Sequence, residues 1–595
     1  MKFSQLAKYF EEIEKTSSRL QITHLLAELY KKLSVDEIDK TIYLLQGRVT
    51  PLFESSEFGM AEQMIIKSVM NSLQVEKKYF VQEYKKLGDL GRTVEHFKKL
   101  YKSIEEKDLK VVDVYNDLLE ITRKTGPKSQ EVKISILAKL ISYLDPLSCR
   151  YLVRIPIGAL RLGFSDMTVL DAFSWMIKKD KSLRPLFEKA YHVRPDLGYL
   201  GKVIKQKGEK IGQVVHPTLF TPIIMMRAER LSSGKEIIKK IGKCSVEPKY
   251  DGFRLQIHYS KTKQEVRLYS RNLEEVSFMY PDIVEGVKRE VKAKEAIFEG
   301  EAIGFDPATG NFLPFQETVQ RKRKYDIVET AKKIPLKFFT FDILYENGKN
   351  FIGEVFTERR KRLEKIIKNS SDHHKYTIFI ASDNVTDSPK KLEMMFDDAV
   401  SRGLEGIVAK KLNGIYQPGA RGWNWIKLKR SYSSKIDDTI DCLIMGYDFG
   451  KGKRTDFGIG AFLAGVYDNK RDMFVTVAKV GTGLSDDEWR HLKKIGEKYK
   501  TNKKPALFEV DKAMEVDVWI KPSIVVEIKA DEITRSPVHT AGRKMKSSKS
   551  GSAFDVDVPG YALRFPRLER FREDKRQEDV TTLKELESLF KGQKK

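Results

Sequence analysis

At 595 residues the chain is longer than one hydrophobic core usually supports, so two to four domains are expected. Its 41% hydrophobic content is ordinary for a globular protein, and neither a signal peptide nor an apolar run long enough to cross a bilayer is found. The 109 Lys and Arg residues against 84 Asp and Glu residues leave a net charge of +25, which favours a polyanionic partner over a surface adapted only for solubility or heat.

The three cysteines, Cys149, Cys244 and Cys442, are far apart and form no CxxC pair. This spacing argues against a disulfide framework and against a structural zinc site. A reducing, cytoplasmic compartment is therefore expected. No stretch has the heptad pattern of a coiled coil, so a monomer is expected.

The first part of the chain, to about residue 205, has helical periodicity. Phe3, Leu6, Phe10 and Ile13 fall on one face of a predicted helix. A second apolar face comprises Val132, Ile136, Leu140 and Leu144. Gly126-Pro127 and Asp145-Pro146 interrupt the pattern, which predicts helix ends at these points.

From about residue 215 short β-rich runs alternate with helical stretches, which predicts an α+β domain ending near Arg430. The predicted strands cover 255–259, 266–270 and 337–345, and the predicted helices 357–367 and 389–400. Beyond this domain, Gly-rich turns separate the runs 441–447, 462–467, 474–480 and 524–530, with one helix over 486–500. These short strands predict a small β-barrel. The Lys/Ser/Gly-rich stretch 544–552 is predicted to be a mobile loop.

Lys249, in Lys249-Tyr250-Asp251-Gly252-Phe253-Arg254, is the candidate nucleophile. A free lysine amine is mostly protonated at neutral pH, and a neighbouring guanidinium or a bound Mg²⁺ would favour the neutral, attacking form. Gly252 permits a close backbone approach. Taken alone, the same residues could form an ordinary Asp-Gly turn beside a surface lysine.

Further candidates follow in fixed order along the chain. Glu301 in Phe298-Glu299-Gly300-Glu301, and Glu405 at the start of 405–410, are suited to holding a hard divalent cation. Phe341 offers a flat face for a purine, although an aromatic residue in a strand is more often part of the core. Lys410, Lys427 and Lys429 alternate with apolar residues, so they are expected on one face, where amines suit phosphates and would otherwise simply be solvated.

The series closely resembles the ATP-dependent DNA ligases of the covalent nucleotidyltransferase superfamily, and among them the archaeal and eukaryotic replicative type. The resemblance spans nearly the whole chain. It rests on six short sequence motifs that occur in order: Lys249 to Arg254, Ser270-Arg271-Asn272, Phe298 to Glu301, Phe339 to Asp342, Glu405 to Lys410 with Trp425 to Lys429, and Arg564 to Lys575.

The resemblance implies three domains: an all-α DNA-binding domain at 1–213, an α+β adenylation domain at 214–431 and a β-barrel OB-fold domain at 432–595. It further implies that ATP and Mg²⁺ are used to seal nicks in double-stranded DNA, with AMP carried on Lys249. AMP would pass from Lys249 to the 5′-phosphate of the nick, and the 3′-hydroxyl would then displace it.

The resemblance also implies a role for each matching residue. Glu301 would bond the ribose and, with Glu405, hold the metal. Arg567, Asp574 and Lys575 would orient the departing pyrophosphate when the OB-fold domain closes. The other nucleotide contacts would be made by Glu247 at the adenine edge, Phe341 stacked on the adenine, Arg254 and Arg271 at the ribose or phosphates, and Arg421, Lys427 and Lys429 at the α-phosphate.

In the helical domain Arg150, Arg154 and Arg161 surround a Pro- and Gly-containing turn. They could grip DNA phosphates, or form only a solvated basic face. No clear sliding-clamp-binding motif occurs, and only residues 105–110 lie roughly where one would be expected. The segment 543–559 is longer than the usual link, and its role is open.

Sister enzymes are the nearest alternatives. An mRNA capping enzyme would use GTP and would not need the long helical domain, and an NAD-dependent ligase would carry a four-cysteine zinc module. An RNA ligase usually lacks both the helical domain and the ending at 564–575. A catalytically inactive scaffold that only binds nicked DNA is a further alternative, against which Lys249, Glu301, Glu405 and Lys427 argue. Whether ADP or NAD is also accepted, and whether the role is replication or repair, stays open.

Overall fold

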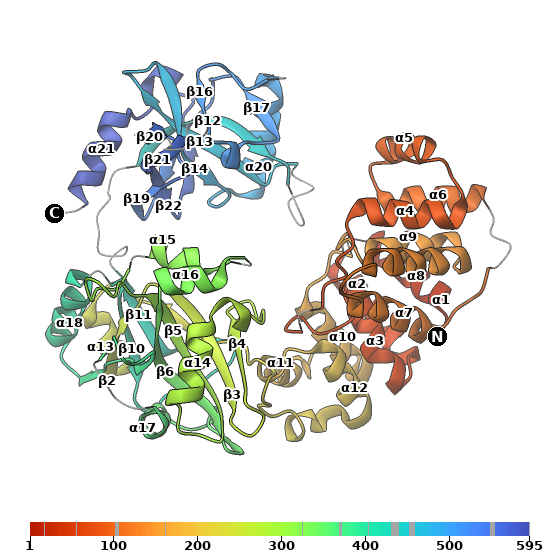
Figure 1. Cartoon of the computed structure of the whole chain (residues 1–595), viewed down its shortest axis with the longest axis horizontal. Helices are drawn as coiled ribbons and strands as arrows, with labels where there is room; N and C mark the ends of the chain where they lie inside the picture. Colours follow the sequence, from red (N-terminus) through yellow and green to blue (C-terminus); the bar gives the residue numbers. More distant parts are fainter. Residues whose placement is uncertain are drawn as a thin grey trace. The chain divides into compact units, whose positions relative to one another are not determined.

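The computed structural model describes residues 1–593 except 17, 55, 102–105, 161, 314, 324, 368–371, 403, 430–438, 451–457, 502 and 548–553. Tertiary contacts divide the chain into two compact units, Met1–Lys427 and Leu428–Lys595 (Figure 1). Within the described ranges, no helix combines the length and the apolar character needed to span a membrane.

The first part of unit one is helical, as the sequence predicts. Its helices are α1 (Phe3–Glu14), α2 (Arg19–Lys32), α3 (Val35–Leu45), α4 (Glu62–Leu73), α5 (Lys77–Leu87), α6 (Leu90–Leu100), α7 (Val111–Arg123), α8 (Ser129–Tyr143), α9 (Pro146–Arg154), α10 (Asp166–Lys178), α11 (Arg184–Val193) and α12 (Leu197–Lys207). A 3₁₀ turn, Gly208–Gln213, follows α12. These helices bury one continuous apolar core.

The apolar faces of α1 and α8 show where periodicity succeeds and where it drifts. All four residues predicted on the face of α1 are fully buried. On α8, Leu140 and Leu144 are buried as predicted, but Val132 is 39% exposed, and Leu137 and Ile141 are buried as well. The buried face is therefore shifted in part from the predicted one, because α8 packs against α4 and α7.

The predicted breaks at Gly126-Pro127 and Asp145-Pro146 are confirmed. Residues 124–128 separate α7 from α8. Asp145 caps α9 by accepting hydrogen bonds from the backbone N–H groups of Leu147 and Ser148, and Pro146 occupies the first helical position. Proline is tolerated there because that backbone position needs no N–H donor.

Two sheets form the rest of unit one. The five-stranded sheet has the order β1 (Arg227–Arg230), β11 (Arg421–Lys429), β10 (Gly406–Lys411), β2 (Cys244–Lys249) and β9 (Asn384–Thr386). The six-stranded sheet has the order β4 (Glu265–Ser270), β3 (Phe253–Ser260), β5 (Glu295–Gly304), β6 (Leu336–Glu346) and β7 (Lys349–Asn350), with β8 (Ile378–Ile380) beside β6. The helices here are α13 (Gly234–Ile241), α14 (Pro281–Glu290), α15 (Phe315–Thr318), α16 (Ile327–Lys333), α17 (Phe356–Ile366) and α18 (Pro389–Ser401).

All three strands and both helices predicted for this region are present. Helix α17 packs on β6, and α18 packs on β10 and β2 (Figure 1). Strand β2 belongs to one sheet and β3 to the other, so residues 250–252 cross from sheet to sheet. The crossing places Lys249 where the two sheets meet.

Unit two is rich in antiparallel strands. Its main sheet contains β12 (Ile440–Asp448), β13 (Ala461–Asp468), β14 (Met473–Val480), β15 (Lys500–Thr501), β16 (Phe508–Glu509), β17 (Val518–Ile520), β18 (Val525–Lys529) and β23 (Arg567–Phe571). Two strand pairs accompany it, β19 (Glu532–Ser536) with β22 (Gly560–Arg564) and β20 (Lys544–Ser547) with β21 (Phe554–Val558). The helices are α20 (Asp486–Tyr499) and α21 (Leu583–Gly592).

The four strands and the helix predicted for unit two are confirmed. The loop predicted over 544–552 is wrong at its start, because Lys544–Ser547 pairs with β21 as a strand. Residues 548–552 lie outside the described part of the chain. Composition misled here because lysine and serine on a two-stranded ribbon remain compatible with backbone pairing.

Candidate active site

Lys249 lies at the end of β2, opposite the start of β10. Lys249 pairs with Gly406 in the antiparallel ladder, and the backbone N–H of Glu405 donates to the carbonyl of Lys249 at 3.0 Å. The Lys249 ammonium contacts the Glu405 carboxylate. Both side chains keep some exposed surface, so reactants can reach them.

The turn after Lys249 is held by close packing. The Tyr250 ring stacks on Phe339, with the ring centroids 4.4 Å apart. A Cβ atom at Gly252 would lie 2.1 Å from the carbonyl oxygen of Ala302 in β5. Only glycine therefore allows this approach of the chain, which is the close contact that the sequence predicts at Gly252.

Glu301 lies on β5 opposite Arg254 of β3. Burial raises the pKa of the Glu301 carboxyl to about 7, against the lowering effect of the Lys249 and Arg254 cations. Glu301 and Glu405 thus both lie near Lys249, on different sheets. Carboxylate oxygens fit Mg²⁺, which commonly binds one or two carboxylates and completes its shell with phosphate and water.

Arg254 is held mainly by a residue that the sequence did not single out for a role. Its Nη2 donates to Glu299 Oε2 at 2.8 Å, and the same oxygen accepts from the Tyr416 hydroxyl at 2.9 Å. Glu299 Oε1 accepts from Gln256 at 3.0 Å. Glu299 is fully buried, so its carboxylate holds the Arg254 guanidinium from the protein interior.

The same side chains anchor residues 220–226, which we call the connector because they link the helices to the sheets. His258 Nδ1 accepts from the Phe220 N–H at 2.9 Å, and burial lowers the pKa of His258 to about 3, which keeps it neutral. Gln256 bonds both the N–H and the C=O of Ile223. Arg254 Nη1 donates to the Met226 carbonyl at 2.7 Å.

Glu247 points into the interior beside Phe341. Lys410 Nζ lies 2.7 Å from Glu247 Oε2 and also donates to the Phe341 carbonyl at 2.8 Å. The Phe341 ring meets Trp425 edge-on at 5.9 Å, and Lys410 and Arg254 lie near its face. Lys410 is buried against Glu247, whereas Lys427 and Lys429 on β11 keep exposed surface, so the three amines predicted to share one face differ in their exposure.

Two further nucleotide candidates are Arg271 and Arg421. Arg271 follows β4 in an exposed turn. Arg421 begins β11, and its side chain lies outside the described part of the structure.

In unit two, the predicted pyrophosphate-orienting residues are held by ion pairs. Arg567 on β23 lies 3.3 Å from Asp531, and Lys575 Nζ lies 2.6 Å from Asp441. Asp574 pairs with Arg572 at 2.8 Å. The acidic partners of Arg567 and Lys575 would compete with a phosphate for these cations.

Comparison with known proteins identifies the family to which this chain belongs. Three sequence profiles match in order: "DNA ligase N terminus" over 2–174, "ATP dependent DNA ligase domain" over 225–429 and "ATP dependent DNA ligase C terminal region" over 455–575. A "Probable DNA ligase" of Dictyoglomus turgidum is 46% identical, with 100% of this chain and 98% of that protein covered. This chain belongs to the ATP-dependent DNA ligase family.

Proteins of lower sequence identity also match over nearly the whole chain. "DNA ligase 2" of Thermofilum pendens is 39% identical, with 100% of this chain and 98% of that protein covered. The solved structure named "Pmar-Lig_PreS3" is 17% identical, with a TM-score of 0.52, 95% of this chain and 99% of that chain covered, and supports the fold alone. The ligase has the multidomain architecture of its family, with a helical N-terminal region and a sheet-rich C-terminal region.

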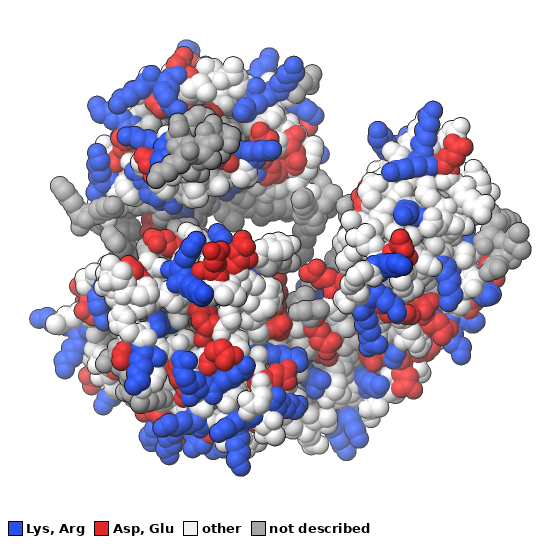
Figure 2. All heavy atoms as spheres, viewed as in Figure 1, with Lys and Arg blue, Asp and Glu red and all other residues white. Residues whose placement is uncertain are grey.

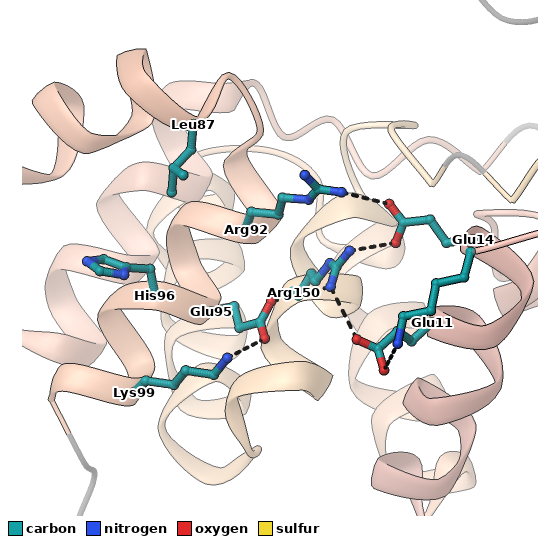
Figure 3. Close-up of a pocket in the computed structure, with 9 residues that line it drawn as sticks. Glu11, Glu14, Leu87, Arg92, Glu95, His96, Lys99 and Arg150 are labelled. Carbon is teal, nitrogen blue, oxygen red and sulfur yellow. Dashed lines mark hydrogen bonds and ion pairs between the residues drawn. The ribbon is translucent and has the colours of Figure 1, made fainter.

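The two described arginines predicted to contact DNA lie in an ion-pair network of the helical region. Figure 3 shows Arg150 in this network. Arg150 is 2.8 Å from Glu14, and Arg154 is 3.1 Å from Glu14 and 2.8 Å from Asp89. Arg150 borders a cavity of about 490 Å³, and Arg154 is almost fully buried. DNA contact by either side chain stays a prediction and would require these pairs to open.

Arg161 lies outside the described residues, as does the first residue of the clamp-motif candidate 105–110. On the face shown in Figure 2, Lys and Arg side chains are spread among Asp and Glu rather than gathered into one patch.

Proposed function

We propose that Lys249 is the adenylated nucleophile of this ATP-dependent DNA ligase and that the side chains around it hold ATP. The observation that carries the proposal is the placement of Lys249 at the junction of the two sheets, with Glu405 in contact and Glu301 nearby. Glu247 and Phe341 lie together and would receive the adenine. Arg254 and Arg271 would contact the ribose or phosphates, and Arg421, Lys427 and Lys429 the α-phosphate.

Three phosphoryl transfers follow. The neutral Lys249 amine attacks the α-phosphorus of ATP, a P–N bond forms and the P–O bond to pyrophosphate breaks. The 5′-phosphate oxygen of the nick then takes the AMP and frees Lys249. The 3′-hydroxyl finally attacks that 5′-phosphate, and AMP departs. Positioning and charge stabilisation supply most of the catalysis in such transfers.

The contact between Lys249 and Glu405 has a chemical consequence. A carboxylate against an ammonium stabilises the protonated amine, which cannot attack. Glu405 must therefore turn from Lys249 toward another positive partner before the first step. Mg²⁺, which Glu301 and Glu405 would hold, neutralises charge on the phosphates when bound.

We further propose three functional regions: an all-α DNA-binding domain at 1–213, an α+β adenylation domain at 214–431 and an OB-fold barrel at 432–595. The helices before residue 214 and the antiparallel strands after 439 support this division. Arg567, Asp574 and Lys575 would orient pyrophosphate in the first step, and Arg150, Arg154 and Arg161 would contact nicked DNA. We expect a monomer, and contact with a sliding clamp is left open.

Intact-mass spectrometry of the purified protein after incubation with ATP and Mg²⁺ tests the nucleophile. The wild type is expected to gain one AMP, and to lose it on addition of nicked duplex DNA with formation of the sealed strand. Lys249→Ala is expected to gain no mass while still binding the nick. Lys261→Ala, in the exposed turn after β3, is the matched control and is expected to behave like the wild type. An adduct that persists in Lys249→Ala would overturn the assignment.

A further inference from the structure

Arg360 on α17 reaches the buried end of Glu247. Its Nη1 lies 3.5 Å from Glu247 Oε1, and the two side chains are 11% and 4% exposed. The rest of the guanidinium is fixed, with Nη2 2.7 Å from the Ala381 carbonyl and 2.9 Å from Asp383, and Nε 2.9 Å from Glu364. The Nη1 edge is therefore held toward Glu247 and cannot swing freely.

The facing atoms of this pair are unusual because both lack a hydrogen bond. Lys410 satisfies Glu247 Oε2, but Glu247 Oε1 and Arg360 Nη1 are buried with no hydrogen-bond partner within the described structure. Buried polar atoms in native proteins nearly always have a partner, so an exception needs an explanation. A ligand that donates a hydrogen bond to Glu247 Oε1 would supply one.

We infer that Arg360 is a positioning residue that sets the preference for adenine, by holding Glu247 Oε1 oriented and ionised as an acceptor for the 6-amino group. The inference rests on the proposed role of Glu247 at the adenine edge. Adenine presents an amino donor at position 6, whereas guanine presents a carbonyl acceptor there. An ionised carboxylate can only accept, so it bonds adenine and repels the guanine oxygen.

The protonation state of Glu247 is therefore decisive for discrimination. Burial raises the pKa of Glu247, Lys410 and Arg360 oppose the rise, and Asp383 adds to it. Tyr250 is the other titratable group nearby, and its raised pKa keeps its hydroxyl neutral. A protonated Glu247 would carry an O–H donor and could bond the guanine oxygen. Losing the Arg360 charge moves Glu247 toward that form.

The surroundings of Arg360 allow it to be replaced. Its side chain borders a cavity of about 820 Å³, together with Tyr250, Phe339, Phe379 and Asp383. A shorter, uncharged side chain would meet open space there and no clash. Lys361, the next residue of α17, is 68% exposed and pairs only with Glu358 among the contacts described, so it offers a control of equal charge in the same helix.

The test compares initial rates of Lys249 adenylation with ATP and with GTP, from pH 5.5 to 8.5, for the full-length protein. Taking the ATP-to-GTP ratio at each pH cancels the titration of Lys249 itself. For Arg360→Gln we expect the ratio to fall most at the acid end of this range, because losing the Arg360 charge raises the pKa of Glu247 and lowers its ionised fraction. The loss is expected to shrink as pH rises and the ionised fraction of Glu247 grows in both proteins. Lys361→Gln is expected to match the wild type.

Two further variants separate the possible outcomes. Glu247→Gln is expected to lower the ratio at every pH. If Glu247→Gln leaves the ratio unchanged, the proposed role of Glu247 fails and the inference fails with it. If Glu247→Gln lowers the ratio but folded Arg360→Gln does not, only the role of Arg360 is overturned.

Arg360→Lys covers the case in which Arg360→Gln does not fold. It keeps the positive charge but loses the planar fork. We expect it to retain most of the ATP preference, with a raised KM for ATP because Glu247 is less well oriented. An unchanged KM and ratio in Arg360→Lys would overturn the positioning role.

Discussion

Glu301 combines two demands that conflict at the level of one side chain. It must lie close to the reacting phosphates to serve the nucleotide or the metal, and the protein around it removes it from water. That burial raises the pKa of Glu301 to about 7, although Lys249 and Arg254 lower it. In the protein without ligands, Glu301 is therefore only partly ionised near neutral pH.

The raised pKa of Glu301 predicts a pH-dependent stability. The pKa of about 7 in the folded state lies above the ordinary value of about 4.3, so the unfolded chain releases this proton first. The contribution of Glu301 to stability is full below pH 4 and is lost as pH rises to 7. Glu301→Gln removes this loss. The unfolding temperature of the variant minus that of the wild type should therefore grow by about 2 °C from pH 5 to pH 8.

Thermal unfolding at both pH values, in EDTA and without nucleotide, measures this difference. Glu285→Gln, at an exposed position of α14, serves as the control and is expected to show no such change. Equal shifts for the two variants would show that burial of Glu301 does not control its charge.

At the scale of elements, α17 is tied to β6 by a buried ion pair. Arg359 Nε lies 2.7 Å from Asp342 Oδ1, and both side chains are fully buried. Arg359 also donates to the Glu354 and Gly414 carbonyls. The next residue, Arg360, depends on this docking to reach Glu247. The pair thus holds in place the helix on which base preference is proposed to rest.

Breaking this pair is expected to undock α17. Asp342→Ala leaves Arg359 charged and buried, which costs roughly 3–5 kcal/mol. Urea unfolding is expected to show a lower midpoint, and limited proteolysis faster cleavage near 356–366. Glu358→Ala on the same helix removes only an exposed pair and is expected to cost much less. A stability unchanged by Asp342→Ala would show that α17 is held by apolar packing alone.

The elements also show how far the sequence could be read. Strand and helix positions followed from periodicity, and the order of six short motifs pointed to Lys249, Glu301, Glu405 and Phe341 as candidate site residues. Glu299 lies inside one of those motifs, yet its partners come from two other segments, β3 and the chain around Tyr416, so nothing local indicates its role. Arg360 has no signal in the sequence, because its contact with Glu247 spans more than a hundred residues and depends on the docking of α17.

A basic sequence pattern does not show which acidic partners its cations have in the fold. Arg150 and Arg154 have a basic, turn-flanking pattern that favoured DNA contact, and the structure surrounds them with Glu14, Glu95 and Asp89. These acidic partners come from helices distant in sequence. Composition can count cations, but only the fold decides which of them are already neutralised.

For the whole molecule, a net charge of +25 predicts strongly salt-dependent DNA binding. Each neutralised phosphate releases counterions, so contact with about six to ten phosphates would weaken binding by roughly 10³–10⁵ between 50 and 200 mM salt. Binding to a fluorescent nicked duplex over a salt series measures the slope. Nicked duplexes of different sequence are expected to bind alike, because phosphate contacts carry no sequence information. A DNA affinity that does not change with salt concentration would contradict binding through the phosphate backbone.

The way in which β3 holds the connector has a consequence for mutational tolerance. His258, Gln256 and Arg254 bond the backbone of residues 220–226. A backbone group is the same whatever residue bears it, so these bonds are indifferent to the connector's own side chains. These bonds would therefore survive changes of the connector's side chains, but Ile223 and Met226 are buried in the core, so such changes would still cost packing. The three anchoring side chains cannot change without loss of the bonds. A chimera that joins a foreign DNA-binding domain to these sheets should keep β3 intact and make its junction on the helical side of Phe220.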